Sequence, residues 1–264
     1  MSDRRALTAR VQEILNDSVV TIGPREAQWI VDAAGDESSA VKMARRRSKG
    51  EPLQYLIGST SFRHIDLEVG PGVFIPRPET ELVAERAIEL LPEGGTLVDV
   101  GTGSGAIALA VASERPDATV LATEADPSAY PWAVRNRDRL GLPVEMIQGD
   151  VFDGLPPALV GSVDVVVSNP PYVSTERRHI LPIDVRNHEP ERALYGGGDG
   201  MAITSRIAEG AHQWLKSGGS LVLEMGEQQQ AAMTALMARL GYRDLVIGID
   251  YARWPRIAVA RWKP

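Results

Sequence analysis

Residues 97–109 read LVDVGTGSGAIAL, an apolar run that breaks at three alternating glycines and continues as an Ala-rich segment. The apolar run predicts a buried strand, and the Ala-rich segment predicts a helix that begins directly after the glycines. Gly101, Gly103 and Gly105 let the backbone of the turn come close to a ligand, and the start of the helix offers free N–H groups. The stretch therefore predicts a strand–loop–helix unit with a ligand site at its turn.

The alternation of strand and helix patterns continues along the chain after Pro78. Short apolar runs typical of strands follow at TVLAT, VEMIQGD, VDVVVSN and SLVLEM, and a last pair of strands is predicted around DLVIGI and RIAVARW. Helical patterns separate most of these runs. Such alternation favours a mainly parallel sheet with helices on both faces. We therefore predict the α/β class, with a doubly wound, mainly parallel, Rossmann-like sheet.

The first 75 residues have a different pattern. Residues 6–48 show the spacing of three helices, and residues 58–75 combine period-two alternation around His64 to Val69 with a Gly-Pro-Gly turn at 70–72, which predicts a β-hairpin. We expect a small N-terminal helical bundle at 1–57, a hairpin linker at 58–75 and the α/β domain at 76–264. Arg45, Arg46 and Arg47 fall in the third helix, where we expect a solvated face, with a docking site as the alternative.

Charge and composition exclude several classes of protein. The net charge is −7, and residues 1–50 carry 9 Lys/Arg against 7 Asp/Glu, whereas the remainder carries 19 against 28. An acidic chain lacks the cationic footprint of a duplex-DNA binder. The chain has no cysteine, which excludes disulfides and Cys-ligated zinc. Because no long apolar stretch predicts a membrane span, we expect a cytoplasmic protein.

Acidic residues follow the second and third strands of the α/β domain. Glu124 lies 23 residues after Gly101, where a carboxylate can accept hydrogen bonds from both hydroxyls of a ribose. Asp150 could accept a hydrogen bond from an adenine amino group, and Val151 or Phe152 could pack on the ring. The residues predicted to bind an adenosine-type cofactor are Gly101, Thr102, Gly103, Ser104, Gly105, Glu124, Asp150, Val151 and Asn169.

Three interpretations of the glycine loop stay open on this evidence. Gly101, Gly103 and Ala106 also satisfy the G-x-G-x-x-G/A pattern of dinucleotide-binding proteins, and a purely structural turn is a further possibility. Asp99 favours a methyltransferase, because Asp-x-Gly-x-Gly-x-Gly resembles the first motif of class I S-adenosylmethionine-dependent methyltransferases, whose loop holds the methionine part. The alternative for Asp99 is an ordinary carboxylate satisfied at a strand end.

The fourth predicted strand of the domain ends in Asn-Pro-Pro-Tyr at 169–172. The two prolines stiffen the turn, and Asn169 comes where open α/β sheets bind ligands. If the Asn169 side-chain oxygen and the Pro170 carbonyl accept the two N–H groups of a planar NH2, they orient its nitrogen for in-line attack on a sulfonium methyl. Tyr172 can lie against the flat face of the amide or base. We predict Asn169, Pro170, Pro171 and Tyr172 as catalytic residues; the alternative is a tight turn after a buried strand.

Together these segments resemble the glutamine methyltransferases of peptide chain release factors, the PrmC/HemK family. The resemblance is carried by RRRSKGEPLQYLIG, VFIPRPETELV, DVGTGSGAIALA, NPPYV, HEPERAL and LVLEMGEQQ, and it covers nearly the whole chain. It implies a cytoplasmic enzyme that uses S-adenosyl-L-methionine to methylate the side-chain amide of the glutamine in the Gly-Gly-Gln loop of bacterial class I release factors. The products would be N5-methylglutamine and S-adenosyl-L-homocysteine.

The same resemblance implies roles for individual parts of the chain. Gly101 to Gly105 would hold the cofactor, Glu124 its ribose, and Asn169 to Tyr172 the substrate glutamine, while the N-terminal bundle would grip the release factor. We expect a monomer with no direct contact to nucleic acid or membrane. We also expect no metal, because the four histidines have no ligand spacing between them.

Three rival functions remain on sequence grounds. A DNA or RNA amino-methyltransferase is the main alternative, because Asn-Pro-Pro-Tyr could hold an exocyclic amine of a base. A nicotinamide-dependent oxidoreductase is favoured only by the glycine loop and leaves Asn169 to Tyr172 unexplained. The third rival is a binding module without activity, whose glycine loop is vestigial.

Overall fold

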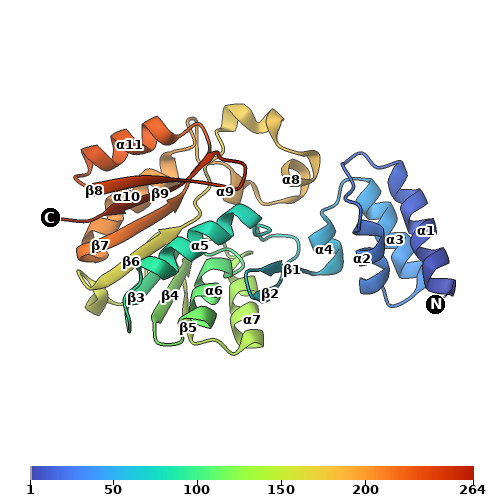
Figure 1. Cartoon of the computed structure of the whole chain (residues 1–264), viewed down its shortest axis with the longest axis horizontal. Helices are drawn as coiled ribbons and strands as arrows, with labels where there is room; N and C mark the ends of the chain where they lie inside the picture. Colours follow the sequence, from blue (N-terminus) through green and yellow to red (C-terminus); the bar gives the residue numbers. More distant parts are fainter. Residues whose placement is uncertain (1) are drawn as a thin grey trace.

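A computed structural model describes residues 2–264, and within them seven strands form one sheet (Figure 1). The strand order is β5-β4-β3-β6-β7-β9-β8. Among these seven strands β9 alone runs opposite in direction to the other six, so the sheet is mainly parallel, as predicted. The strands are β3 (Thr96–Val100), β4 (Thr119–Glu124), β5 (Val144–Gln148), β6 (Val163–Ser168), β7 (Leu215–Glu224), β8 (Arg243–Ile249) and β9 (Pro255–Arg261).

Helices cover both faces of this sheet, which confirms the doubly wound architecture (Figure 1). Successive side chains of a strand point to opposite faces. Leu97 accordingly packs in one core with the helices of the first face. Val98 and Val100 pack in a second core with those of the other face. The first face carries α5 (Pro78–Leu90), α6 (Ala106–Glu114) and α7 (Tyr130–Leu140); the second carries α10 (Ala202–Trp214) and α11 (Gln230–Arg239).

The N-terminal helices form a separate bundle at one end of the molecule (Figure 1). Val11, Leu15 and Ile30 are buried at its centre. Three of its helices were predicted; the fourth, of five residues, is too short to show a helical period in the sequence. The four helices are α1 (Ser2–Asn16), α2 (Glu26–Ala33), α3 (Glu37–Ser48) and α4 (Leu53–Ile57).

A two-stranded hairpin, β1 (Ser59–Phe62) and β2 (Ile65–Glu68), follows the bundle. The turn between its strands lies at Arg63 and His64, and the Gly-Pro-Gly segment forms a separate turn after β2, in which the Val73 N–H donates to the Gly70 carbonyl at 3.3 Å. Arg63 adopts a positive φ of 50° in the hairpin turn, and its backbone N–H donates to Glu81 of α5. The Glu81 carboxylate that accepts this bond stabilises the positive φ of the turn, which the sequence around Arg63 does not predict.

The expectation of a solvated Arg45–Arg47 face was wrong for Arg47. Its guanidinium is buried and binds Glu26 of α2 at 2.6 Å and Asp184 at 3.3 Å. Asp184 belongs to α8 (Ile183–His188) of the α/β domain. The side chain of Arg47 therefore joins two helices of the bundle to the domain that carries the glycine loop.

The chain between β6 and α10 forms short helices beside the carboxyl ends of the strands. They are η2 (Thr175–Ile180), α8 and α9 (Glu191–Leu194); a further short helix, η1 (Pro157–Leu159), precedes β6. Buried Glu189, between α8 and α9, forms an ion pair with Arg77 and accepts from the backbone N–H of Ile75. Burial raises the pKa of Glu189, and the neighbouring Arg77 opposes that shift. Within residues 2–264 no helix is long and apolar enough to cross a bilayer.

Candidate active site

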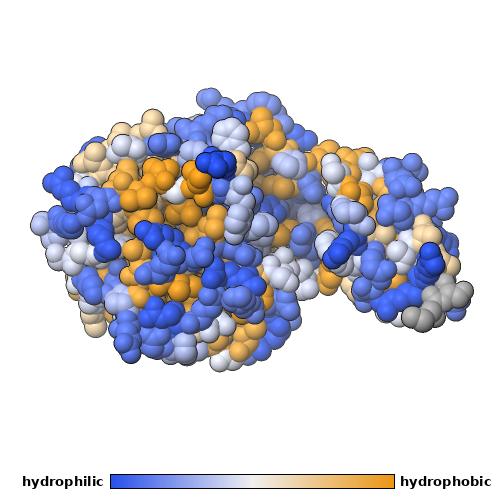
Figure 2. Space-filling view, viewed as in Figure 1, coloured by the Kyte–Doolittle hydropathy of each residue, from blue (hydrophilic) through white to orange (hydrophobic). Residues whose placement is uncertain are grey.

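A cavity of about 240 Å³ opens at the carboxyl ends of β3, β4 and β6. The surface is visibly hollowed between α8 and the start of α5, on the side that faces the bundle (Figure 2). Most of the predicted site residues line the cavity: Gly101, Thr102, Gly103, Ser104, Glu124, Asp150, Val151, Asn169, Pro170 and Pro171. Of the predicted set, Gly105 and Tyr172 are not part of this lining.

The glycine loop takes the conformation that its sequence requires. Gly101, Gly103 and Gly105 all have positive φ, a region that glycine enters without steric cost. The first two would give a side chain open space, so their Cα atoms leave room at the cavity. Gly105 differs, because a Cβ there would lie 2.7 Å from Leu109 Cδ1. Gly105 therefore lets the start of α6 pack closely, behind the cavity wall.

Asp99 lies at the end of β3 beneath the loop and is 1% exposed. Its Oδ2 accepts from Thr102 Oγ1 at 2.6 Å and from the backbone N–H of Ala108 at 3.1 Å. Its Oδ1 is buried and has no hydrogen-bond partner within residues 2–264. Burial raises the pKa of Asp99 to about 7, against the two hydrogen bonds that lower it. A buried acceptor with no partner is costly, and a cationic ligand group in the cavity would satisfy it.

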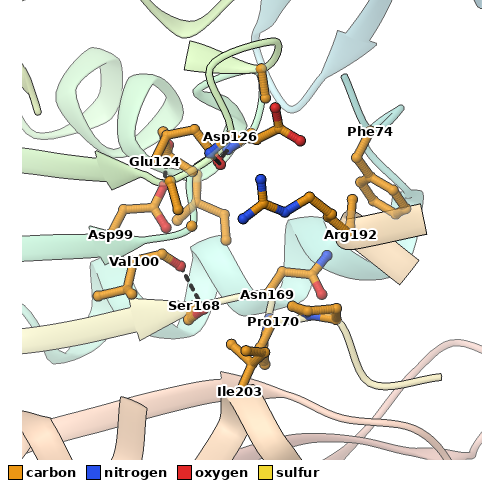
Figure 3. Close-up of a pocket in the computed structure, with 18 of the residues that line it drawn as sticks. Phe74, Asp99, Val100, Glu124, Asp126, Ser168, Asn169, Pro170, Arg192 and Ile203 are labelled. Atoms are coloured by element: carbon orange, nitrogen blue, oxygen red, sulfur yellow. Dashed lines mark hydrogen bonds between the residues drawn. The ribbon is translucent and has the colours of Figure 1, made fainter. Parts of the chain in front are cut away.

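Glu124 ends β4, the strand next to β3, and lies on the same side of the cavity as Asp99 (Figure 3). Its two carboxylate oxygens each accept one backbone N–H at 2.8 Å, from Gly103 and from Asp126. Burial raises the pKa of Glu124, although these N–H groups oppose the shift. Each oxygen keeps a further lone pair, so the carboxylate shapes the glycine loop and still has acceptor capacity for ligand hydroxyls.

Asp150 and Val151 line the cavity after β5. Asp150 is half exposed and forms an ion pair with Arg206 of α10 at 2.9 Å. Val151 has a φ of 57°, which is rare for a β-branched residue and costs of the order of 1–2 kcal/mol. Thr123 Oγ1 donates to the Val151 carbonyl at 2.6 Å and thereby holds the strained turn. Such strain clusters at ligand sites.

The Asn-Pro-Pro-Tyr turn leaves the sheet at the end of β6. Asn169, Pro170 and Pro171 line the cavity, whereas the Tyr172 hydroxyl donates to Glu224 at 3.1 Å. Burial raises the pKa of Tyr172. Gln229 Nε2 donates to the Tyr172 carbonyl at 3.0 Å, so both the side chain and the backbone of Tyr172 are held in place.

The cavity also contains functional candidates that the sequence interpretation missed. Thr80, in the first turn of α5, lines the cavity and binds the Asn169 amide. Arg192 of α9 reaches into the cavity between Asn169 on one side and Glu124 with Asp126 on the other (Figure 3). Both lie in segments that carry the family resemblance, Thr80 in VFIPRPETELV and Arg192 in HEPERAL. The resemblance was the available signal, but it assigned them no role.

The fold and this cavity define the class of protein. A mainly parallel, doubly wound sheet with a glycine loop after its first strand is shared with solved methyltransferases. One is a methyltransferase from Pyrococcus furiosus, with a TM-score of 0.58 and 21% identity over 76% of this chain and 90% of the other. Another is the 16S rRNA N2 G1207 methyltransferase of T. thermophilus, with a TM-score of 0.57 and 19% identity over 78% of this chain and 50% of the other. The chain is a methyltransferase that uses S-adenosylmethionine.

Sequence comparison narrows this class to one family. The family described as Methyltransferase small domain matches residues 66–183. The release factor glutamine methyltransferase of Salmonella typhimurium is 41% identical, over 84% of this chain and 79% of its own length. That of Neisseria gonorrhoeae is 36% identical, over 98% of this chain and 93% of its own. The chain belongs to the release factor glutamine methyltransferase family.

Proposed function

We propose that the chain transfers the methyl group of S-adenosylmethionine to the side-chain amide nitrogen of the glutamine in the Gly-Gly-Gln loop of class I release factors. The observation that carries this proposal is the Asn169 carboxamide, which lines the cavity and donates its NH2 to Thr80 Oγ1 at 3.1 Å. The carboxamide oxygen is thereby left available to accept an N–H of a planar amide.

S-adenosylmethionine supplies a methyl group activated on a sulfonium. The glycine loop and Asp99 would hold its methionine part, and the partnerless Asp99 Oδ1 is an acceptor suited to an ammonium group. Glu124 would accept the ribose hydroxyls with its remaining lone pairs. Asp150 and Val151 would border the adenine. The buried orphan oxygen and the acceptor capacity of Glu124 both fit this cofactor.

On the substrate side, the residues orient an amide nitrogen that is a poor nucleophile. We propose that Asn169 Oδ1 and the Pro170 carbonyl each accept one N–H of the glutamine amide, which directs the nitrogen lone pair at the methyl group. These acceptors also favour the positive charge that develops on the nitrogen as it attacks. The N–C bond would form as the C–S bond of the sulfonium breaks, and the nitrogen would then lose one proton to solvent, which gives N5-methylglutamine and S-adenosyl-L-homocysteine. Pro170 and Pro171 keep the turn rigid, and Tyr172 would support it from behind through its hydrogen bond to Glu224.

The N-terminal bundle, residues 1–57, is proposed to dock the release factor. Its support is the joint at Arg47, which connects the bundle to α8 beside the cavity. A docked partner would thus lie next to the hollow that admits the Gly-Gly-Gln loop. The net charge of −7 supports a protein substrate without nucleic acid, and a release factor substrate places the reaction in the cytoplasm.

The test is transfer of radiolabel from S-adenosylmethionine to three acceptors in separate reactions. These are a purified class I release factor, the same factor with its Gly-Gly-Gln glutamine changed to alanine, and total bacterial nucleic acid. We expect label on the first acceptor alone. Label on nucleic acid alone would overturn the substrate, and equal labelling of both release factors would overturn the target residue.

A further inference from the structure

Four side chains from three distant segments form a hydrogen-bonded chain behind the Asn-Pro-Pro-Tyr turn. Asn169 Nδ2 donates to Thr80 Oγ1 at 3.1 Å, and Thr80 Oγ1 donates to Glu224 Oε2 at 2.7 Å. The Tyr172 hydroxyl donates to the other carboxylate oxygen of Glu224 at 3.1 Å. Thr80 is 3% exposed and Glu224 is 1% exposed, so water does not compete for these groups. The chain therefore links the end of β7 to the cavity.

The donors and acceptors in this chain fix one direction. An ionised carboxylate only accepts hydrogen bonds, so Thr80 must give its single hydroxyl proton to Glu224. Thr80 Oγ1 is then left with lone pairs alone and can receive only the NH2 end of the Asn169 carboxamide. The oxygen end of that carboxamide is consequently turned away from Thr80. Glu224 decides this orientation although the residues are far apart in the sequence.

We propose that Glu224, acting through Thr80, is a positioning residue that sets which end of the Asn169 carboxamide meets the substrate amide. This inference rests on the proposed function, because it assigns a task to residues behind the same site. Without the chain, the carboxamide can rotate by half a turn and present a donor where the substrate also presents donors. The NH2 group of Asn169 would then repel the NH2 group of the substrate amide and would not bind it.

The protonation state of Glu224 also affects the orientation of the Asn169 carboxamide. A protonated Glu224 would donate to Thr80, which would free the Thr80 hydroxyl proton to point at Asn169 and favour the wrong end of the carboxamide. Burial raises the pKa of Glu224 to about 7, and hydrogen bonds from Thr80 and Tyr172 oppose that shift. Among the charged groups near it, Arg256 of β9 lowers this pKa and Glu79 of α5 raises it. The correct orientation is thus favoured as the pH rises through about 7.

The experiment compares Thr80→Val with Thr80→Ser. Valine keeps the shape of threonine but removes the hydroxyl, whereas serine keeps the hydroxyl. We expect Thr80→Val to lower kcat for release factor labelling roughly tenfold, the size of one ordinary hydrogen bond, with an unchanged Kd for S-adenosylmethionine. Thr80→Ser should restore most of the rate. Equal rates for the two variants and the wild type would overturn the inference.

A double-variant cycle separates positioning from structural support. If Thr80 acts through Asn169, adding Thr80→Val to Asn169→Ala costs nothing further. Losses that multiply would show that Thr80 acts by another route and would overturn the inference. The loss of kcat below pH 7, measured at saturating cofactor, should also disappear in Glu224→Gln.

The outcomes of these experiments distinguish a failure of this inference from a failure of the proposed function. If the wild-type protein labels no release factor, the proposed function fails. If the wild type labels the factor and Thr80→Val labels it equally well, only the role of Glu224 and Thr80 fails. Thermal unfolding of each variant checks that the fold is retained. If a Glu224 variant does not fold, the comparison of Thr80→Val with Thr80→Ser still tests the inference.

Discussion

The two halves of the cavity are built in opposite ways. The half proposed to bind the cofactor, called the cofactor half, consists mainly of one short stretch, in which Gly101 and Gly103 form the loop and Glu124 fastens it from the next strand. The half proposed to bind the substrate, called the substrate half, is formed by residues 80, 169, 172 and 224, and the bond from Thr80 to Glu224 spans 144 positions. Backbone conformation shapes the first half, and side-chain hydrogen bonds shape the second. The first is thus local and the second depends on the whole fold.

This difference predicts that a substitution in one half of the cavity impairs the task of that half and leaves the task of the other half largely unchanged. Damage to the cofactor half should weaken binding of S-adenosylmethionine and leave the transfer step largely intact once the site is saturated. Damage to the substrate half should slow transfer without weakening the cofactor. Each variant below therefore needs two measurements, a cofactor Kd and a kcat.

The largest effect is expected for Asn169→Ala. Removal of one preorganised polar group at a reacting centre costs roughly 10²–10³ in kcat. The Kd for S-adenosylmethionine, measured by calorimetry, should stay within about twofold, because the proposed role of Asn169 is to bind the substrate amide, although the sequence also predicted it as a cofactor ligand. A parallel rise in Kd would instead place Asn169 in both halves and weaken the comparison.

A smaller effect is expected for Glu124→Gln. Its carboxylate accepts from Gly103 and Asp126, and a carboxamide would present an NH2 group to one of these donors. Hydrogen bonds to charged groups contribute about 1.5–3 kcal/mol, so the cofactor Kd should rise roughly tenfold to a hundredfold. The kcat at saturating cofactor should change little. A large loss of kcat would show that Glu124 also acts in the transfer step, and the two halves of the cavity would then not be independent.

The smallest effect is the pH dependence of cofactor affinity. Asp99 has a pKa of about 7 in the free protein, so below pH 7 an ammonium group must displace a proton from it. Affinity should therefore fall about fivefold from pH 7 to pH 6, steepen towards tenfold per pH unit below that, and level off above about pH 8. Calorimetric titration at several pH values measures this slope, and Asp99→Asn should flatten it.

The same group has a defined effect on folding. The pKa of Asp99 is raised from 3.8 to about 7 on folding, so the unfolded chain loses its proton first as the pH rises. The contribution of Asp99 to stability is thus present at low pH, declines between about pH 4 and pH 7, and is constant above that. Urea unfolding of the wild type against Asp99→Asn measures this decline.

The sequence predicted the parts of the molecule whose causes are local. The alternation of strand and helix patterns predicted the sheet, and the resemblance of the Asp99–Gly105 motif and of the whole chain to known methyltransferases predicted the cofactor and the class of enzyme; all three were confirmed. The roles of the individual site residues stay predictions. Thr80 and Glu224 could not be predicted, because nothing near either residue indicates that the fold brings them together. The positive φ of Val151 is likewise held by Thr123 from another strand.

The burial of Arg47 was missed for a related reason. A run of three arginines is usually solvated, and helical spacing alone does not say that one of them meets two carboxylates. Glu26 lies 21 positions away and Asp184 lies 137 positions away. Long-range ion pairs of this kind become visible only when the helices have been placed.

The ion pairs of Arg47 with Glu26 and Asp184 also restrict which changes the sequence can accept during evolution. The buried guanidinium of Arg47 cannot lose Glu26 cheaply, because an uncompensated buried charge costs about 3–5 kcal/mol, and Asp184 adds a second carboxylate to the same group. A foreign bundle spliced onto this α/β domain would have to bring its own cation to Asp184. An exchanged bundle would thus have to match the α/β domain at this one buried contact, whereas substitutions elsewhere in the bundle would leave the contact intact.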